Sequence, residues 1–173
     1  TSKEKLDDLK SLMKDALKDS KHSFRIFALG SSSNTEPNIR TVVLRDFSLN
    51  NRNIDCHSDI RSPKINELNQ NNYVEAMFYC SENKIQARIS GKVEIIHNNK
   101  ETLDRWNSLT ESSKRCYLGP YSPSTMLESY HANIPDDFKF KNPTPEQSKI
   151  GYTNFVIIRI HFLKIDFLEL KYS

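Results

Sequence analysis

Short strand-like segments separated by turn residues fill the first half of the chain, and they restrict its fold more than any other feature. The clearest is Arg40–Arg45 (RTVVLR), a β-branched run bounded by turn residues, which predicts a well-buried strand. Further strands are expected at Ser23–Leu29, Ile54–Ser58, Tyr73–Cys80 and Ile85–Ile96. The intervening turns are Gly30–Asn38, Asn50–Asn53 and Ser81–Lys84. This succession predicts an antiparallel sheet.

Helical patterns surround these strands. Leucine, methionine and alanine recur at helical spacing from Lys5 to Asp19, and Thr1 with Glu4 forms a capping-box pattern before them. Ser62–Asn69 resembles a short helix with proline at its first position, and Asn99–Tyr117 has a helical pattern. Two closing strands are expected at Asn154–His161 and Lys164–Leu170.

The order of these segments predicts a mainly β (α+β) fold, a six-stranded antiparallel Greek-key barrel with peripheral helices. We expect a single domain over residues 1–173, because this length is enough for one core. Its parts are a helix over 4–19, a barrel core over 23–97, a helix over 99–117, an irregular arm over 118–151 and a C-terminal hairpin over 152–171.

The arm is rich in proline, serine and asparagine, which excludes a long regular element. A segment of this kind is usually a lid, an interface arm or partly disordered, and the sequence leaves these three alternatives open. Its Tyr121 and Tyr130, with Trp106 and Tyr117 before them, either wall a planar ligand or pack in the core and at an interface.

Composition excludes several classes of function. The 25 Lys and Arg residues exceed the 22 Asp and Glu residues by only three, and the two signs alternate, so no nucleic-acid partner is expected. The three cysteines, Cys56, Cys80 and Cys116, show no CxxC spacing, and the five histidines show no HExxH motif, so no metal site is expected. The reduced cysteines and the lack of a long apolar run or signal core favour a cytoplasmic protein without a membrane partner.

Basic residues gather around the predicted strands and the short helix. Arg40 and Arg45 bracket one strand, while Arg61, Ser62 and Lys64 lie at the start of the helix. Cations and a hydroxyl group at a helix N-terminus suit a phosphate by charge and hydrogen bonding. The alternative is that they are ordinary solvated charges beside apolar strands.

Three motifs in register resemble the FMN-binding core of the pyridoxamine 5′-phosphate oxidase family. They are RTVVLR at Arg40–Arg45, HSDIRSPK at His57–Lys64 and KIQARISG at Lys84–Gly91. The resemblance extends from Ser23 to about Val93 and resumes more loosely in WNSLTESSKRCYL and in NFVIIRIHFLKIDFLEL. It implies a split β-barrel that binds FMN at the interface of a homodimer, in the branch of small flavin-binding relatives.

The resemblance also implies roles for individual residues. Arg40 and Lys64 would hold the FMN phosphate, with Ser62 and Arg61 beside them. The flavin ring would be lined by Thr41, Val42, Val43, Leu44 and Arg45, and contacted by His57 and Ser58. Gln86 and Arg88 would reach the flavin of the partner subunit. Arg45 is the candidate for a group that faces substrate near the ring.

Departures from the family pattern separate the cofactor from the substrate. Pro63 replaces an arginine, Arg45 replaces a lysine, and Trp106, Thr110 and Lys114 stand near the positions of the oxidase's substrate-phosphate residues without matching them. The C-terminal Arg-x-His segment is also missing from this sequence. The expected substrate is therefore a small molecule other than, or in addition to, a B6 vitamer.

Three functions follow as alternatives. The first is an FMN-dependent oxidoreductase, in which the flavin performs the redox step and no catalytic triad is needed. The second is a flavin-binding protein without B6 oxidase activity, such as a reductase, carrier or sensor. The third is a split barrel that binds another planar ligand, such as heme or a deazaflavin.

Overall fold

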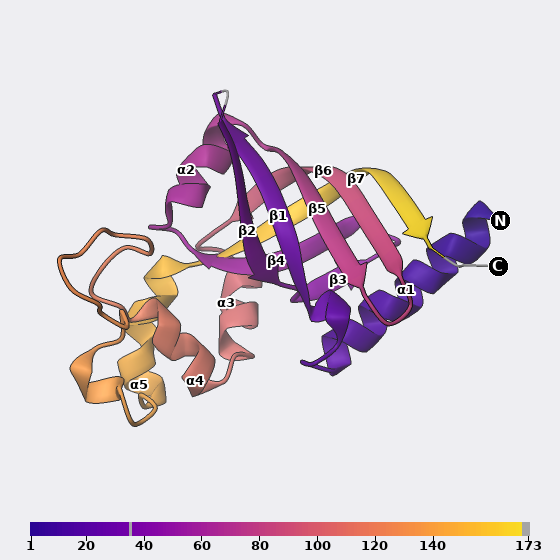
Figure 1. The fold of residues 1–173 in the computed structure, drawn as a ribbon. Helices are drawn as coiled ribbons and strands as arrows, with labels where there is room; N and C mark the ends of the chain where they lie inside the picture. The colour runs from indigo at the N-terminus through magenta and orange to yellow at the C-terminus, as the bar shows by residue number, and fades with distance from the viewer. Residues whose placement is uncertain (35, 171–173) are drawn as a thin grey trace. The chain divides into compact units, whose positions relative to one another are not determined.

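The computed structural model describes residues 1–34 and 36–170 (Figure 1). Its regular elements alternate as the sequence predicts, with strands gathered in the first half of the chain and short helices in the second. In chain order they are α1 (Ser2–Lys18), η1 (Ser23–Arg25), β1 (Ile26–Ser33), β2 (Glu36–Val43), β3 (Asp46–Ser48), β4 (Asn53–Asp59), α2 (Pro63–Gln70), β5 (Tyr73–Cys80), β6 (Ile85–Ile96), α3 (Lys100–Asn107), α4 (Glu111–Lys114), η2 (Arg115–Tyr117), η3 (Asp136–Phe138), α5 (Pro145–Ser148), η4 (Lys149–Asn154) and β7 (Phe155–Glu169).

The strands form one seven-stranded sheet in the order β2-β1-β5-β6-β7-β4-β3. Its two ends, β2 and β3, are separated in the chain only by Leu44 and Arg45. The Leu44 N–H donates to the carbonyl of Arg25, just before β1, whereas the Arg45 N–H donates to the carbonyl of Asp55 on β4. Successive residues therefore bond to opposite ends of the sheet. The sheet curls into a split barrel whose open seam lies at this corner (Figure 1).

The chain divides into two compact units. The first, here called the barrel unit, comprises residues 1–57, 67–94 and the chain from Ile158 onward. Its core is aromatic: Phe78 stacks on Phe27 with ring centroids 4.5 Å apart and contacts Phe24 at 5.3 Å. Helix α1 contributes its own buried stripe, which consists of Leu9, Met13 and Ala16. This stripe has the helical spacing that the sequence shows.

The second unit, here called the helical unit, comprises residues 58–66 and 95–157. Its core contains Ile96, Trp106, Phe155 and Ile157, with Tyr117 and other partly buried residues packed against them. Because Trp106 is only 3% exposed and its ring centroid lies 5.6 Å from that of Tyr117, both aromatics belong to a core. The core alternative for this pair is therefore confirmed.

Several predicted elements are confirmed. Strands β5 and β6 have the predicted ends, α1 carries the predicted capping box, and α2 begins at the expected proline. The arm contains only short helices, as its prolines require. Its base is closed by Tyr121 and Asn133, since the backbone N–H of Tyr121 donates to the Asn133 side chain and that side chain donates back to the Tyr121 carbonyl.

Four predictions about the strands and helices were wrong. The sheet has seven strands, not six, because the three-residue β3 is too short to show a period. The predicted C-terminal hairpin is one continuous strand, β7, since no turn residue interrupts it; residue 171 of that prediction lies outside the described residues. The predicted turn Gly30–Asn38 is mostly strand. The helix expected over 99–117 breaks before α4, where the Thr110 side chain accepts from the Ser113 N–H and caps a new helix.

No helix within the described residues is both long enough and apolar enough to pass through a lipid bilayer.

Candidate functional site

Arg40 lies on β2 opposite Leu29 of β1, and its side chain is 20% exposed. One terminal nitrogen, Nη1, donates to Ser31 Oγ at 2.5 Å, and the other, Nη2, donates to Glu67 Oε2 at 2.7 Å. The Ser31 hydroxyl donates to the same carboxylate oxygen at 2.9 Å. This closed ring of hydrogen bonds fixes the guanidinium. Nη1 also donates to the Leu29 carbonyl at 3.5 Å. Within residues 1–34 and 36–170, three of the five guanidinium N–H donors have acceptors, so Nε–H and one Nη2–H are left for an anion.

The residues after Arg40 alternate between the two faces of β2. Val42 and Leu44 point into the barrel core, at 7% and 0% exposed, whereas Thr41 is exposed and Val43 is half-buried on the outer face. A ligand outside the barrel would therefore meet the side chains of Thr41 and Val43 and the backbone of the other two. The predicted contact with a flavin ring through this backbone stays a prediction.

Arg45 is half-buried at the seam of the barrel, close to a second arginine. This neighbour, Arg25, donates to the carbonyls of Ala16 and Leu17 at the end of α1. Burial lowers the pKa of Arg25, and the positive charge of Arg45 lowers it further. Among the described residues no carboxylate pairs with Arg45. The seam therefore carries an excess of positive charge, which suits an anionic or electron-rich ligand.

His57 and Ser58 are neighbours near the end of β4. His57 is half-buried in the barrel unit, and Ser58, in the helical unit, is 6% exposed. The Ser58 hydroxyl donates to the Asp59 carbonyl at 3.4 Å. Successive side chains of a strand project to opposite faces. A flat ligand on one face would therefore meet only one of these two side chains.

Gln86 and Arg88 both lie on the outer face of β6, where they pair in register with Tyr79 and Met77 of β5. Arg88 forms an ion pair with Asp166 of β7, with its Nε 3.2 Å from Oδ2. Hydrogen bonding to Asp166 raises the pKa of Arg88, and the same bond lowers the pKa of the Asp166 carboxyl. Gln86 and Arg88 thus share one exposed face with large apolar side chains.

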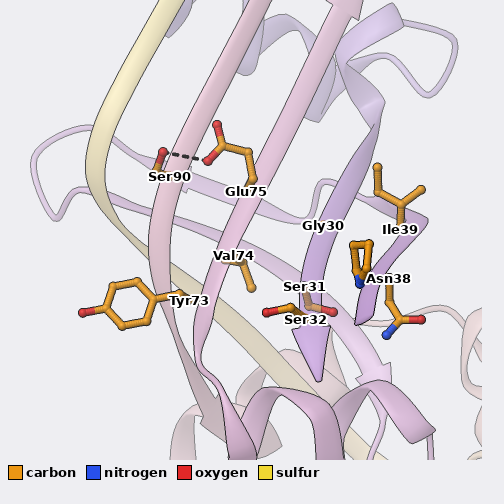
Figure 2. A pocket seen from close by; sticks show the side chains of 10 residues that line it. Gly30, Ser31, Ser32, Asn38, Ile39, Tyr73, Val74, Glu75 and Ser90 are labelled. Carbon is orange, nitrogen blue, oxygen red and sulfur yellow. Dashed lines mark hydrogen bonds between the residues drawn. The ribbon is translucent and has the colours of Figure 1, made fainter. Parts of the chain in front are cut away.

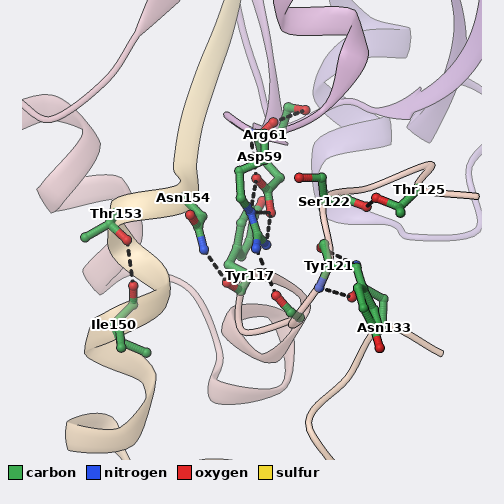
Figure 3. Close-up of polar contacts among 12 residues, drawn as sticks. Asp59, Arg61, Tyr117, Tyr121, Ser122, Thr125, Asn133, Ile150, Thr153 and Asn154 are labelled. Carbon is green, nitrogen blue, oxygen red and sulfur yellow. Dashed lines mark hydrogen bonds and ion pairs between the residues drawn. The ribbon is translucent and has the colours of Figure 1, made fainter. Parts of the chain in front are cut away.

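In the helical unit, Arg61 is committed to protein partners. Its Nε and Nη2 donate to the two oxygens of Asp59, at 3.0 and 2.7 Å, and its Nη1 donates to the Gly119 carbonyl at 2.9 Å (Figure 3). Hydrogen bonding to Asp59 raises the pKa of Arg61. All three guanidinium nitrogens are used, so Arg61 holds the beginning of the arm.

Ser62 and Lys64 lie at the first turn of α2. Ser62 is 6% exposed; its N–H donates to the Asp59 carbonyl and its own carbonyl accepts from the Ile65 N–H, which starts the helix. Lys64 is half-buried. A hydroxyl, an ammonium group and the N-terminus of an eight-residue helix form a donor set that suits a phosphate group.

A hollow of about 600 Å³ lies on the outer face of the barrel unit (Figure 2). Gly30 lies at its middle and has no side chain to fill it, while Ile39 and Tyr73 stand at its sides. A Cβ atom on Gly30 would lie no closer than 3.6 Å to its neighbours, so a small side chain would fit at this position. Its lining consists of Gly30, Ser31, Ser32, Pro37, Asn38, Ile39, Tyr73, Val74, Glu75 and Ser90.

The residues near the oxidase's substrate-phosphate positions have structural roles in the helical unit. Trp106 is a core residue, and Thr110 caps α4. Lys114 is only 7% exposed, donates to Glu111 at 2.8 Å and lies 5.7 Å from the centroid of the Trp106 ring. In the part of the chain that the structure describes, no three His, Cys, Asp or Glu side chains gather as metal ligands.

Sequence reasoning missed Ser31 and Glu67, the two partners of Arg40. Ser31 lies within the segment that the sequence assigned to a turn, and Glu67 appeared to be an ordinary polar residue of a short helix. Glu67 is the one acidic residue of α2, which is the only sequence signal that points to it.

Cations at the seam of the curled sheet, and separately a phosphate-type donor set at the start of α2, suit the class of protein that binds a cofactor carrying an anionic group. The comparison with known families identifies the class further: the domain described as pyridoxamine 5′-phosphate oxidase, FMN-binding domain, matches residues 7–97, more than half of the chain. The chain belongs to this family, and FMN is its cofactor. By donor type, the guanidinium of Arg40 in the barrel unit and the hydroxyl and ammonium groups of Ser62 and Lys64 in the helical unit each suit a phosphate.

Relatives of known sequence and structure agree with this fold. The chain is 27% identical over 145 residues to pyridoxine/pyridoxamine 5′-phosphate oxidase 2 of Arabidopsis thaliana, covering 80% of this chain and 69% of that protein. A pyridoxamine 5′-phosphate oxidase-related, FMN-binding protein from Nostoc punctiforme superimposes with a TM-score of 0.68 at 21% identity, over 94% of this chain and 84% of that one. PhzG from Burkholderia lata gives a TM-score of 0.63 at 15% identity, over 95% and 79%.

Proposed function

We propose that the chain is an FMN-dependent oxidoreductase that acts on a small-molecule substrate other than, or in addition to, B6 vitamers. The match of residues 7–97 to an FMN-binding domain carries this proposal, since it includes every candidate site residue from Arg40 to Arg88. When bound, FMN supplies hydride acceptance at N5 and reoxidation by oxygen. The protein then needs only to bind the flavin, orient the substrate and exclude competing reactions.

The phosphate contacts in this proposal are Arg40, Ser62 and Lys64. Arg40 brings a fixed, half-buried guanidinium with unused donors, and the other two bring a hydroxyl and an ammonium group at the start of α2. Arg61 takes an indirect part, because its guanidinium is bonded to Asp59 and Gly119. It holds the loop before Ser62 in place.

The ring contacts in this proposal lie along β2 and at the seam. The backbone from Thr41 to Leu44 lines the ring system, and Arg45 faces its polar edge and the substrate. The excess positive charge that Arg45 shares with Arg25 supports this assignment, because a reduced flavin carries extra negative charge. One of the neighbours His57 and Ser58 contacts the flavin through its side chain and the other through its backbone, because their side chains point to opposite faces of the strand.

We propose further that two copies of the chain form a dimer with FMN at their interface. The outer face of β2, β1, β5 and β6 exposes large apolar side chains that a solvated surface rarely gathers. They are Ile26 (55% exposed), Ile39 (78%), Tyr73 (56%), Met77 (38%) and Tyr79 (49%). Gln86 and Arg88 share this face, which supports a role for them at the flavin of the partner subunit.

The proposed substrate differs from that of the B6 oxidases. Trp106 and Lys114 are buried in the helical unit, and the Lys114 ammonium group is paired with Glu111. Peroxide release with pyridoxamine or pyridoxine phosphate is therefore expected to be weak or absent. Strong peroxide release with either vitamer would refute the proposed difference in substrate and make the chain a B6 oxidase.

Titration of the flavin-free protein with FMN tests the proposed site. Arg40→Ala and Lys64→Ala should each weaken FMN binding by about 1–3 kcal/mol, the scale of one charge-assisted hydrogen bond. Lys14→Ala, an exposed lysine on α1, is the matched control and should leave the affinity unchanged. Unchanged affinity in both site variants would remove the phosphate assignment, and binding of heme or a deazaflavin in place of FMN would favour the third function.

A further inference from the structure

The Glu67 side chain is fixed against Arg40, one of the proposed phosphate ligands. Its Oε2 accepts hydrogen bonds from Arg40 and from Ser31, and its side chain is 18% exposed. The helix end that carries it is anchored to β1, since the Asn71 side chain donates to Ser32 Oγ at 2.9 Å. The Asn71 N–H also donates to the Glu67 carbonyl. The carboxylate is therefore a fixed negative charge.

This fixed charge acts on Arg40 in two opposite ways. It orients the guanidinium, because Nη2 and the Ser31 hydroxyl meet on one carboxylate oxygen. It also neutralises the guanidinium, and a phosphate that accepts from an unused Arg40 donor would lie on the same guanidinium as a second anion, the Glu67 carboxylate. Near a protein surface, repulsion between two anions bound to one guanidinium lowers the affinity for the second anion, here the FMN phosphate, by roughly tenfold.

We propose that Glu67 is a positioning residue that also limits the affinity of the chain for the FMN phosphate. The inference rests on the proposed role of Arg40 as a phosphate ligand. In the flavin-free chain Glu67 balances the charge of a half-buried cation, whose other hydrogen-bond partners among the described residues, Ser31 and the Leu29 carbonyl, are neutral. In the FMN complex the carboxylate and the phosphate compete for the same guanidinium, so that the cofactor is held less tightly than the donor set alone would hold it.

Glu67→Gln separates charge from position, since the amide oxygen keeps an acceptor for Arg40 and Ser31 but carries no charge. FMN should bind this variant about tenfold more tightly than it binds the wild type, whereas riboflavin, which has no phosphate, should bind both equally. Glu67→Ala removes the acceptor as well, so its FMN affinity should be below that of Glu67→Gln. Glu94→Gln, a carboxylate paired with His161 elsewhere in the barrel unit, should change neither affinity.

A second readout does not depend on turnover. Thermal unfolding of the flavin-free Glu67→Gln protein should occur at a lower temperature than that of the wild type, because the ion pair is lost. The rise in unfolding temperature on addition of FMN should be larger in the variant, as tighter binding requires. A variant that only damaged the fold would show the first effect without the second, and this result would overturn the proposal.

The same titrations distinguish failure of the proposed role of Arg40 from failure of the proposed role of Glu67. If Arg40→Ala weakens FMN and riboflavin equally, or weakens neither, the phosphate role of Arg40 fails and the inference about Glu67 fails with it. If Arg40→Ala weakens FMN alone but Glu67→Gln leaves FMN affinity unchanged or lower, Arg40 keeps its role and the inference about Glu67 is refuted.

Discussion

Replacing Ile39 by alanine tests the proposed dimer face at its most exposed apolar side chain. Ile39 is 78% exposed on the outer face of β2, so a partner that covers it would remove most of its side chain from water. The substitution deletes three carbon atoms, worth about 2.4 kcal/mol when they are fully buried. The exposed share of this amount is about 1.9 kcal/mol, and a two-fold interface loses it twice. The dimer dissociation constant should rise by roughly 500-fold.

Sedimentation equilibrium over a range of protein concentrations measures this constant. Ile150→Ala is a matched control, because Ile150 is 73% exposed but belongs to the helical unit and is not one of the residues of the proposed face. It should leave the dissociation constant unchanged. If the wild-type chain is monomeric at all concentrations, or if Ile150→Ala weakens the dimer as strongly as Ile39→Ala does, the reasoning about this face is wrong. FMN affinity should fall together with dimer affinity, since the proposed site includes residues from both copies.

Three further predictions concern particular contacts. Gly91→Ala should lower the free energy of unfolding by about 1–3 kcal/mol in urea titrations, because its Cβ would lie 2.5 Å from a backbone oxygen of β7, while Gly30→Ala, with 3.6 Å of room, should be nearly neutral. Hydrogen bonding to Lys114 lowers the pKa of Glu111, so this pair stabilises the fold above the ordinary carboxyl pKa and is lost as the pH falls through the lowered pKa. Wild type should therefore lose more stability on acidification than Glu111→Gln, and equal losses would contradict the assignment. Arg61→Ala should speed proteolysis within the arm, since the bond to the arm's first turn is removed; an unchanged cleavage rate would show that other contacts hold it.

The strands of the barrel were predictable where turn residues bound them on both sides. Tyr73–Cys80 and Ile85–Ile96 have the expected ends because a polar turn separates two apolar runs. β3 escaped prediction because three residues show no period. β7 was predicted as two strands, although no turn residue separates them. Local pattern therefore gave the elements but not their full lengths.

The candidate site was predictable only in part, for a physical reason. Motifs in register pointed to Arg40 and to the start of α2 as candidates, because each motif is a short run of residues that can be read directly from the sequence. The acceptor of Arg40 is Glu67, 27 residues further along the chain, and only the folded structure brings them together. The same holds for Arg61, whose bond to Gly119 spans 58 residues. Long-range partners of this kind leave no periodic trace in a sequence.

The absorption spectrum of the purified protein, followed by titration of the flavin-free form with FMN, tests the central claim most directly. We expect visible flavin bands in the protein as isolated, or their recovery with one FMN per chain after FMN is added to the flavin-free protein. The bands should weaken in Arg40→Ala at equal FMN concentration and stay unchanged in Lys14→Ala. A colourless protein that gains no bound flavin when FMN is added would contradict the account.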